Sequence, residues 1–170
     1  MRQSRTMAAA RKPVIVRRFT QNWLAGYLAA DFAAADLELL DPAGRLLHLP
    51  WDEIKWVCQV RELPGPTERA NPERLLHKRF ATRPRSAGLW LRLTLGDGEL
   101  LEGLAANDLS LLATNGLLLI PPDTRSNTQR IFVPRPAIAS LEVVALINTA
   151  NRRRPPTLRP PELFPPETDA

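Results

Sequence analysis

Two short polar segments carry the residues of this sequence that are best suited to binding a ligand. One is the basic pair at 78–79, and the other is a polar stretch at 123–130 between two strand-like segments. Guanidinium and ammonium groups bind phosphates and carboxylates, so basic side chains gathered in one place would form an anion site. The candidate site for an anion or a protein partner comprises Lys78, Arg79, Arg125, Ser126, Asn127 and Arg130.

The stretch at 123–130 also has a purely structural explanation. Asp123, Ser126 and Asn127 belong to the residue types that hydrogen-bond their own loop backbone, and that role alone would account for them. Against this stands the length of the loop, since long connections often carry binding function. Both interpretations stay open at the level of the sequence.

Tryptophan at a turn gives a second candidate contact. Trp51 follows Pro50 where the strand pattern breaks, and an exposed ring there would suit a protein contact or, if the protein binds RNA, base stacking. Trp56 shares a strand face with Cys58 and Val60, which predicts burial in the core instead.

Residues that could support catalysis or hold a metal are sparse and scattered. His48 and His77 are the two histidines, and neither has suitable partners nearby in the sequence. The single cysteine, Cys58, rules out the usual zinc spacings. Asp97 and the acidic pair at 52–53 lie beside expected turns, where acids serve local hydrogen bonds. We therefore expect no catalytic residue, cofactor or metal site, and no enzyme.

The elements that must position these residues follow from an internal repeat. LAGYLAADF at 24–32 is echoed by LEGLAANDL at 101–109, and the spacing of Leu, Pro and Ile at 49–57 is echoed at 133–141 in the same order. A repeat of roughly 50 to 60 residues is too long for a solenoid unit and long enough for one small barrel.

Short strands with hairpin connections are expected in both halves. Each half has a glycine inside its second strand and a one-turn break before its last strand, a pattern typical of SH3-like and Sm-like barrels. The expected strands are 13–19, 23–30, 36–40, 45–49 and 54–61 in the first half, and 89–95, 99–106, 117–120, 130–133 and 137–147 in the second.

The fold class expected is therefore all-β: two tandem small SH3-like or Sm-like five-stranded barrels, joined by a Pro-rich linker and flanked by disordered tails. The Pro-rich stretches and the runs of basic residues set the boundaries. The expected parts are a basic tail at 1–12, the first barrel at 13–63, a linker at 64–87 with a short helix, the second barrel at 88–147, and a Pro- and Arg-rich tail at 148–170.

Composition and charge limit the classes of partner and the cellular compartment expected for this chain. The chain of 170 residues carries a formal net charge of +5, which invites a nucleic-acid interpretation, but its basic residues concentrate in the tails and linker. A lone cysteine and the absence of a signal-peptide pattern or long apolar run predict a cytoplasmic protein with no transmembrane segment. Thin aliphatic cores favour packing of the halves against each other, or a dimer.

Several motifs resemble those of an uncharacterised bacterial family of tandem small barrels. They are Lys78-Arg79-Phe80, Gly96-Asp97-Gly98-Glu99, Glu102-Gly103 and Ser126-Asn127-x-x-Arg130-Ile131-Phe132-Val133. The members are domains of unknown function, some associated with PilZ-type or other signalling modules. The first half departs from the pattern at 20–23, where an Asp-Gly turn would be expected. The resemblance implies a tandem all-β fold and no assigned reaction.

The function expected from these features is that of a non-enzymatic interaction or adaptor module in a bacterial regulatory or envelope-associated assembly. Its partner would be a protein that the sequence does not identify. The alternative is an RNA- or other nucleic-acid-binding protein that uses Sm-like barrels and the basic tails. Few basic residues lie on the expected strands, and this favours the adaptor.

Overall fold

The computed structural model describes residues 11–65, 77–123 and 125–148, and these fold into strands and three single-turn 3₁₀ helices. The all-β prediction is confirmed. The predicted tails lie largely outside the described residues, and so does most of the segment where a linker helix was expected. Among the described residues, no helix is long and apolar enough to cross a membrane.

Both halves contain the five strands that the sequence predicts. In the first repeat they are β1 (Pro13–Arg18), β2 (Trp23–Leu28), β3 (Leu37–Leu40), β4 (Leu46–Leu49) and, after the turn η1 (Trp51–Glu53), β5 (Ile54–Val60). In the second repeat they are β6 (Gly88–Leu95), β7 (Leu100–Ala105), η3 (Leu109–Leu112), β8 (Gly116–Ile120), β9 (Thr128–Pro134), η4 (Arg135–Ala137) and β10 (Ile138–Ile147).

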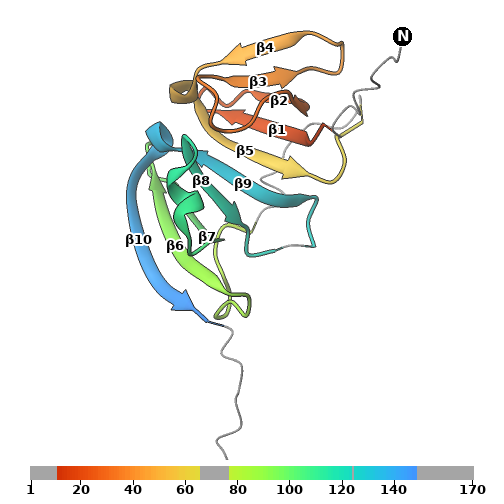
Figure 1. Ribbon diagram of the computed structural model, residues 1–170. Coiled ribbons are helices and arrows are strands. Elements are labelled where there is room, and N and C mark those ends of the chain that lie inside the picture. Colours follow the sequence, from red (N-terminus) through yellow and green to blue (C-terminus); the bar gives the residue numbers. More distant parts are fainter. Residues whose placement is uncertain (1–10, 66–76, 124, 149–170) are drawn as a thin grey trace, which may run out of the picture.

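The ten strands form one continuous antiparallel sheet, in the order β10-β6-β7-β8-β9-β5-β1-β2-β3-β4. The expectation of two separate closed barrels is therefore not confirmed, because the sheet runs through both repeats and is not closed. Strand β5 explains why: it is buried along its whole length, and its alternate side chains enter apolar clusters on the two faces of the sheet. One edge of β5 pairs with β1, and the other edge pairs with β9 of the other repeat, as Figure 1 shows where the two strands lie side by side.

The two repeats have the same strand order and the same register. The predicted equivalence of Gly26 with Gly103, and of Pro50 with Pro134, is confirmed by the cross-strand pairs. Each proline precedes a single 3₁₀ turn that leads into the last strand of its repeat. The matched pairs are Val14–Gly26 with Leu91–Gly103, Tyr27–Leu40 with Leu104–Ile120, and Leu37–Leu49 with Leu117–Val133.

The first hairpin adopts the same turn as the second despite its different sequence. The amide of Gln21 donates to the carbonyl of Arg18, as the amide of Gly98 donates to that of Leu95. Gly98 has a φ of 84° and Gln21 a φ of 63°. Gln21 therefore adopts the left-handed backbone region in which glycine is favoured. The register holds the turn in place where the expected Asp-Gly signal is missing.

Replacing Gln21 by glycine should stabilise the protein. We expect Gln21→Gly to raise the free energy of unfolding by about 0.5–1 kcal/mol, because glycine adopts this φ without the steric cost of a Cβ. Urea denaturation measures the change. Thr20→Gly is the control, since Thr20 has no positive φ and should gain nothing. Equal effects of the two changes would contradict the explanation.

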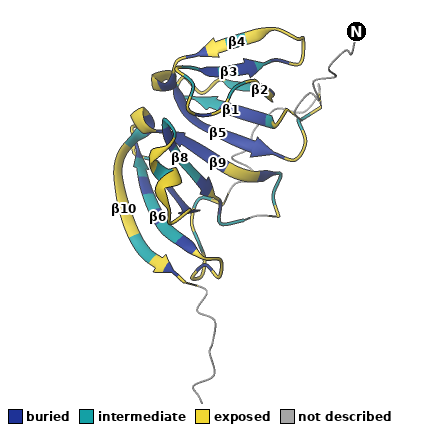
Figure 2. Cartoon of the chain, viewed as in Figure 1, coloured by how far each residue is buried: buried dark blue, intermediate teal, exposed yellow. Residues whose placement is uncertain are grey.

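Two apolar clusters lie on opposite faces of the sheet, and both cross from one repeat to the other. Alternate residues of β5 enter different clusters: Trp56 and Cys58 pack with the second repeat, and Val57 packs with the first. Phe132 of β9 likewise enters the cluster of the first repeat. Figure 2 shows β5 buried throughout, whereas β4 and β10 at the two ends of the sheet carry exposed residues. The repeats therefore share their cores.

Candidate functional site

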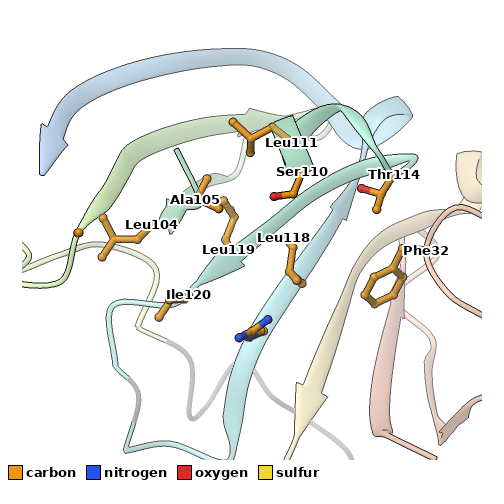
Figure 3. Close-up of a pocket in the computed structure, with 12 residues that line it drawn as sticks. Phe32, Leu104, Ala105, Ser110, Leu111, Thr114, Leu118, Leu119 and Ile120 are labelled. Carbon is orange, nitrogen blue, oxygen red and sulfur yellow. The ribbon is translucent and has the colours of Figure 1, made fainter. Parts of the chain in front are cut away.

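A pocket of about 350 Å³ opens beside β7, β8 and η3 of the second repeat. We call it the repeat-2 pocket. Its wall is mostly apolar, and Phe32 reaches it from the loop after β2 of the first repeat (Figure 3). A concave apolar site with a few polar groups is the usual form of a ligand site. The lining residues are Phe32, Ala87, Leu104, Ala105, Ala106, Ser110, Leu111, Thr114, Leu118, Leu119, Ile120 and Arg130.

Three polar side chains interrupt the apolar wall. The Thr114 hydroxyl donates to the Gly116 carbonyl at 2.9 Å, so it serves the backbone. Ser110 lies two residues after Asp108, whose carboxylate accepts from the Ser110 amide at 2.8 Å. Hydrogen bonding from the Ser110 side chain, and then from its amide, lowers the pKa of Asp108. Arg130 is exposed, and among the described residues no carboxylate pairs with it. Its guanidinium is the group best placed to bind an anion at this pocket.

The pocket is bordered by the most exposed large apolar residues of the described chain. On η3, Leu109 is 81% exposed and Leu112 75% exposed, on either side of the lining residues Ser110 and Leu111. Ile120, at the end of β8, is exposed as well. Exposed leucines next to an apolar pocket mark a surface suited to another molecule.

The predicted loop residues 125–127 lie outside this pocket and have structural roles. The Asn127 amide group donates to the Glu62 carbonyl at 2.8 Å and accepts from the Glu62 amide at 3.1 Å. The Ser126 hydroxyl lies 3.0 Å from the Asp123 carbonyl, and the Arg125 amide donates to the Asp123 carboxylate. Asn127 thereby fixes the chain after β5 to the loop before β9.

Lys78 and Arg79 are not gathered with Arg130. Lys78 pairs with Glu99 and lies 5.9 Å from the centre of the Trp56 ring, on the sheet face that carries the second repeat's core. Arg130 lies on the opposite face, beside Phe132 in the alternation of β9. Arg79 is exposed. The predicted basic cluster is thus divided between the two faces of the sheet.

Trp51 is a correction to the sequence analysis, because the predicted exposed contact is a core residue. Its side chain is only 8% exposed, and its indole nitrogen donates to the Ala34 carbonyl at 3.0 Å. The ring packs against Phe132 and Phe32, which themselves stack with centroids 4.0 Å apart. The sequence analysis missed this burial because Phe132 comes from the other repeat.

An ion cluster joins the repeats on the sheet face that carries Trp56 and the second repeat's core. Lys55 of β5 is 1% exposed and pairs with Asp97 at 2.5 Å and with Glu99, both in the hairpin between β6 and β7. Lys78 adds a second cation at Glu99. Burial by itself would raise the pKa values of Asp97 and Glu99, but the bonds from Lys55 lower both below their usual values. We call these four residues the Lys55 clamp.

The buried acid Glu102 connects the end of the linker to the sheet. Glu102 accepts hydrogen bonds from the Phe80 amide, the Trp90 indole and the Arg92 guanidinium. Burial opposes its ionisation, and these bonds together hold the pKa of Glu102 below its usual value. Both oxygens of this carboxylate accept hydrogen bonds that fix the fold, so Glu102 is a structural residue.

Two features of the described residues bear on metal binding and nucleophilic chemistry. Within the described ranges no group of three or more His, Cys, Asp or Glu residues could hold a metal. Cys58 is buried, and burial raises the pKa of its thiol to about 12, so it is unreactive at neutral pH. Among the described residues, the arrangement offers an apolar pocket with the exposed Arg130 in its lining, on an all-β sheet that joins the two repeats.

Comparison with known proteins places the chain in a family. It belongs to a family of unknown function, DUF6982, which matches residues 10–145 and so covers both repeats. The predicted membership of an uncharacterised family is confirmed by this match. None of the curated proteins or solved structures that were compared gives a significant match.

Proposed function

We propose that this protein is a non-enzymatic interaction module that uses the repeat-2 pocket to bind an apolar, acidic segment of a protein partner in a regulatory or envelope-associated assembly. The observation that carries the proposal is the position of Leu109 and Leu112, the two most exposed leucines of the described residues, beside an apolar pocket. Apolar side chains of the partner would fill the pocket, and burial of apolar surface would supply most of the affinity.

Arg130 gives the pocket its chemical preference. Its guanidinium stands in a lining that holds no acidic side chain. A carboxylate of the partner that meets Arg130 at the edge of the pocket would form a charge-assisted hydrogen bond. The preferred segment therefore combines two or more large apolar residues with an Asp or Glu.

The nucleic-acid alternative has weaker support. Most of the cations on the described strands already face carboxylates, which makes them poor partners for phosphates. The pairs on strands are Arg18 with Glu53, Lys55 with Asp97 and Glu99, and Arg92 with Glu102 and Glu142. Outside the strands, Arg45 pairs with Asp41 and Lys78 with Glu99.

A peptide-display selection against the full chain tests the proposal. We expect enriched peptides that contain large apolar residues and an acid. Ala106→Trp should raise their dissociation constant by about 10-fold or more, because exposed Ala106 lines the pocket and an indole there would fill it. Arg130→Glu should weaken acidic peptides and favour basic ones. Fluorescence polarisation measures both effects.

The repeat supplies a matched control. Ala29 stands at the position in the first repeat that Ala106 occupies in the second, and it is also exposed. Ala29→Trp should leave peptide binding unchanged. Peptides that bind Ala106→Trp as tightly as the unmodified chain would remove the pocket from the proposal. A single-stranded RNA probe that binds more tightly than any peptide at physiological salt would support the alternative function.

A further inference from the structure

The joint between the two repeats is a pairing between two strands, β5 and β9. The molecule contains a second copy of each of these two strand types, and both copies lie at the ends of the sheet. Strand β5 pairs antiparallel with β9, with Val57 opposite Phe132 and Gln59 opposite Arg130. In terms of the repeat, the last strand of one unit is joined to the second-last strand of the other. The two strands at the ends of the sheet, β10 and β4, are the remaining copies of these same two strand types.

Strand β10 has the properties of an open pairing edge. It is ten residues long and, among the described residues, pairs with β6 along one side only and forms one end of the sheet (Figure 1). Leu141, Val143 and Leu146 on this strand are 46%, 55% and 45% exposed. A long edge strand with exposed apolar residues is a template for another strand unless charges or bulges protect it. The register shifts of β10 lie between Ile138 and Ser140 and between Val143 and Ala145, so residues 140–143 remain regular for pairing.

Strand β4 offers the complementary edge. When the repeats are matched through Pro50 and Pro134, Leu46 of β4 stands where Arg130 stands in the joint. On β10, Val143 stands where Gln59 stands. Leu46 is 49% exposed. The polar pair of the internal joint is thus replaced at the two free edges by two exposed apolar residues, which would lie directly opposite each other in the same register.

We propose that β10 of one molecule pairs antiparallel with β4 of a second copy of this chain, in the register of the internal β5–β9 joint. Leu46 then faces Val143, and His48 faces Leu141. The contact is heterologous, so each molecule keeps one free edge and assembly continues to a ring or a filament. This inference goes beyond the proposed function and does not rest on the repeat-2 pocket.

The contact between copies should be weaker than the internal joint. Glu142 of β10 occupies the position of buried Cys58, and it forms an ion pair with Arg92 at 3.1 Å. Opposite it, Leu47 takes the place of Ile131. A partly exposed charge against a leucine adds less affinity than two buried apolar side chains. We expect reversible assembly that depends on protein concentration.

Two edge substitutions test the proposal with the full chain. Val143→Lys blocks β10 and Leu46→Lys blocks β4, and lysine on an exposed edge position opposes strand pairing without disturbing the core. In sedimentation velocity, the unmodified chain should form species larger than a dimer as concentration rises. Each variant alone should be monomeric, with association weakened by about 10-fold or more.

The decisive result is the mixture of the two variants. Each retains one functional edge, so an equimolar mixture should form a one-to-one heterodimer and nothing larger. A mixture that stays monomeric would overturn the proposal, and so would assembly of either variant alone. Assembly abolished by Val143→Lys but unaffected by Leu46→Lys would indicate β10–β10 pairing instead and also overturn it.

Cysteine crosslinking checks the register independently. Since Cys58 is buried, Leu46→Cys and Val143→Cys introduce the accessible thiols. A mixture of these two variants should form a disulfide between chains, and neither should crosslink when alone. Tyr27→Cys is the control partner for Val143→Cys, because Tyr27 is 37% exposed but lies on the internal strand β2. Equal crosslinking of Val143→Cys with both partners would contradict the proposed register.

Discussion

Gly26→Ala should lower the free energy of unfolding by about 3 kcal/mol, among the largest single-residue effects in this protein. A Cβ at Gly26 would overlap the Leu40 carbonyl oxygen and touch the Leu39 side chain. Backbone cannot move aside as a flexible side chain does, so β2 and β3 must separate. Chemical denaturation at neutral pH measures the loss.

The repeat predicts a graded series that tests the cause. At the matched Gly103, a Cβ would lie 2.8 Å from the Leu119 Cβ and 3.1 Å from the Ile120 oxygen, so Gly103→Ala should cost about 2 kcal/mol. Gly96→Ala is the control and should stay within about 0.5 kcal/mol, because a Cβ there meets only the Phe19 ring at 3.8 Å. A Gly26→Ala variant as stable as the Gly96→Ala variant would contradict the steric explanation.

These two glycines also show why much of the fold could be predicted from the sequence. Each lies inside a strand, where glycine indicates close backbone approach, and the same order of glycine, turn and proline in both halves indicates a repeat. Such signals are local, and the strands they predict are observed. The joint is not local, because it depends on which strand completes β5. A closed barrel and a shared sheet require the same alternation of residues, so the sequence pattern did not separate them.

The candidate site was predicted less well, for a related reason. Arg130 was identified as an anion-binding candidate and lines the repeat-2 pocket. Lys78 was grouped with it because both are basic, yet the two lie on opposite faces of the sheet. One feature of the sequence could have indicated the pocket: the leucine-rich segment at 109–112, which lies beside an expected loop. Leucines outside a strand pattern are a reason to expect an exposed apolar surface.

The burial of Lys55 also depends on a contact between the repeats, and this contact affects stability. A lysine within an apolar strand suggests an exposed position, but a register shift in the pairing of β1 with β5 places it beside the hairpin of the other repeat. There the Lys55 side chain is 1% exposed, and its charge is compensated by the carboxylates of Asp97 and Glu99. A buried ammonium that loses its counter-charges is far more costly than the intact cluster is favourable.

Neutralising both acids of the Lys55 clamp should therefore have the largest effect of all. We expect the double variant Asp97→Asn/Glu99→Gln to lose about 3–5 kcal/mol of stability at pH 7, because Lys55 stays buried without a carboxylate. Adding Lys55→Met should recover most of the loss, since the methionine needs no counter-charge. Urea denaturation of the three chains measures both steps. A double variant as stable as the unmodified chain would show that the clamp contributes nothing.

The pH dependence of stability provides an independent test of the Lys55 clamp. The pKa values of Asp97 and Glu99 are lowered in the folded chain, from ordinary values of 3.8 and 4.5. The unfolded chain therefore binds protons more readily, and the stabilisation is complete above the unfolded pKa values and is lost as pH falls through the folded ones. The unmodified chain should lose stability from roughly pH 5 downward. The triple variant should lose less over that range, because the acids that remain perturbed, such as Glu102, are fewer. Parallel stability curves for the two chains between pH 7 and pH 3 would mean that these carboxylates do not couple the repeats.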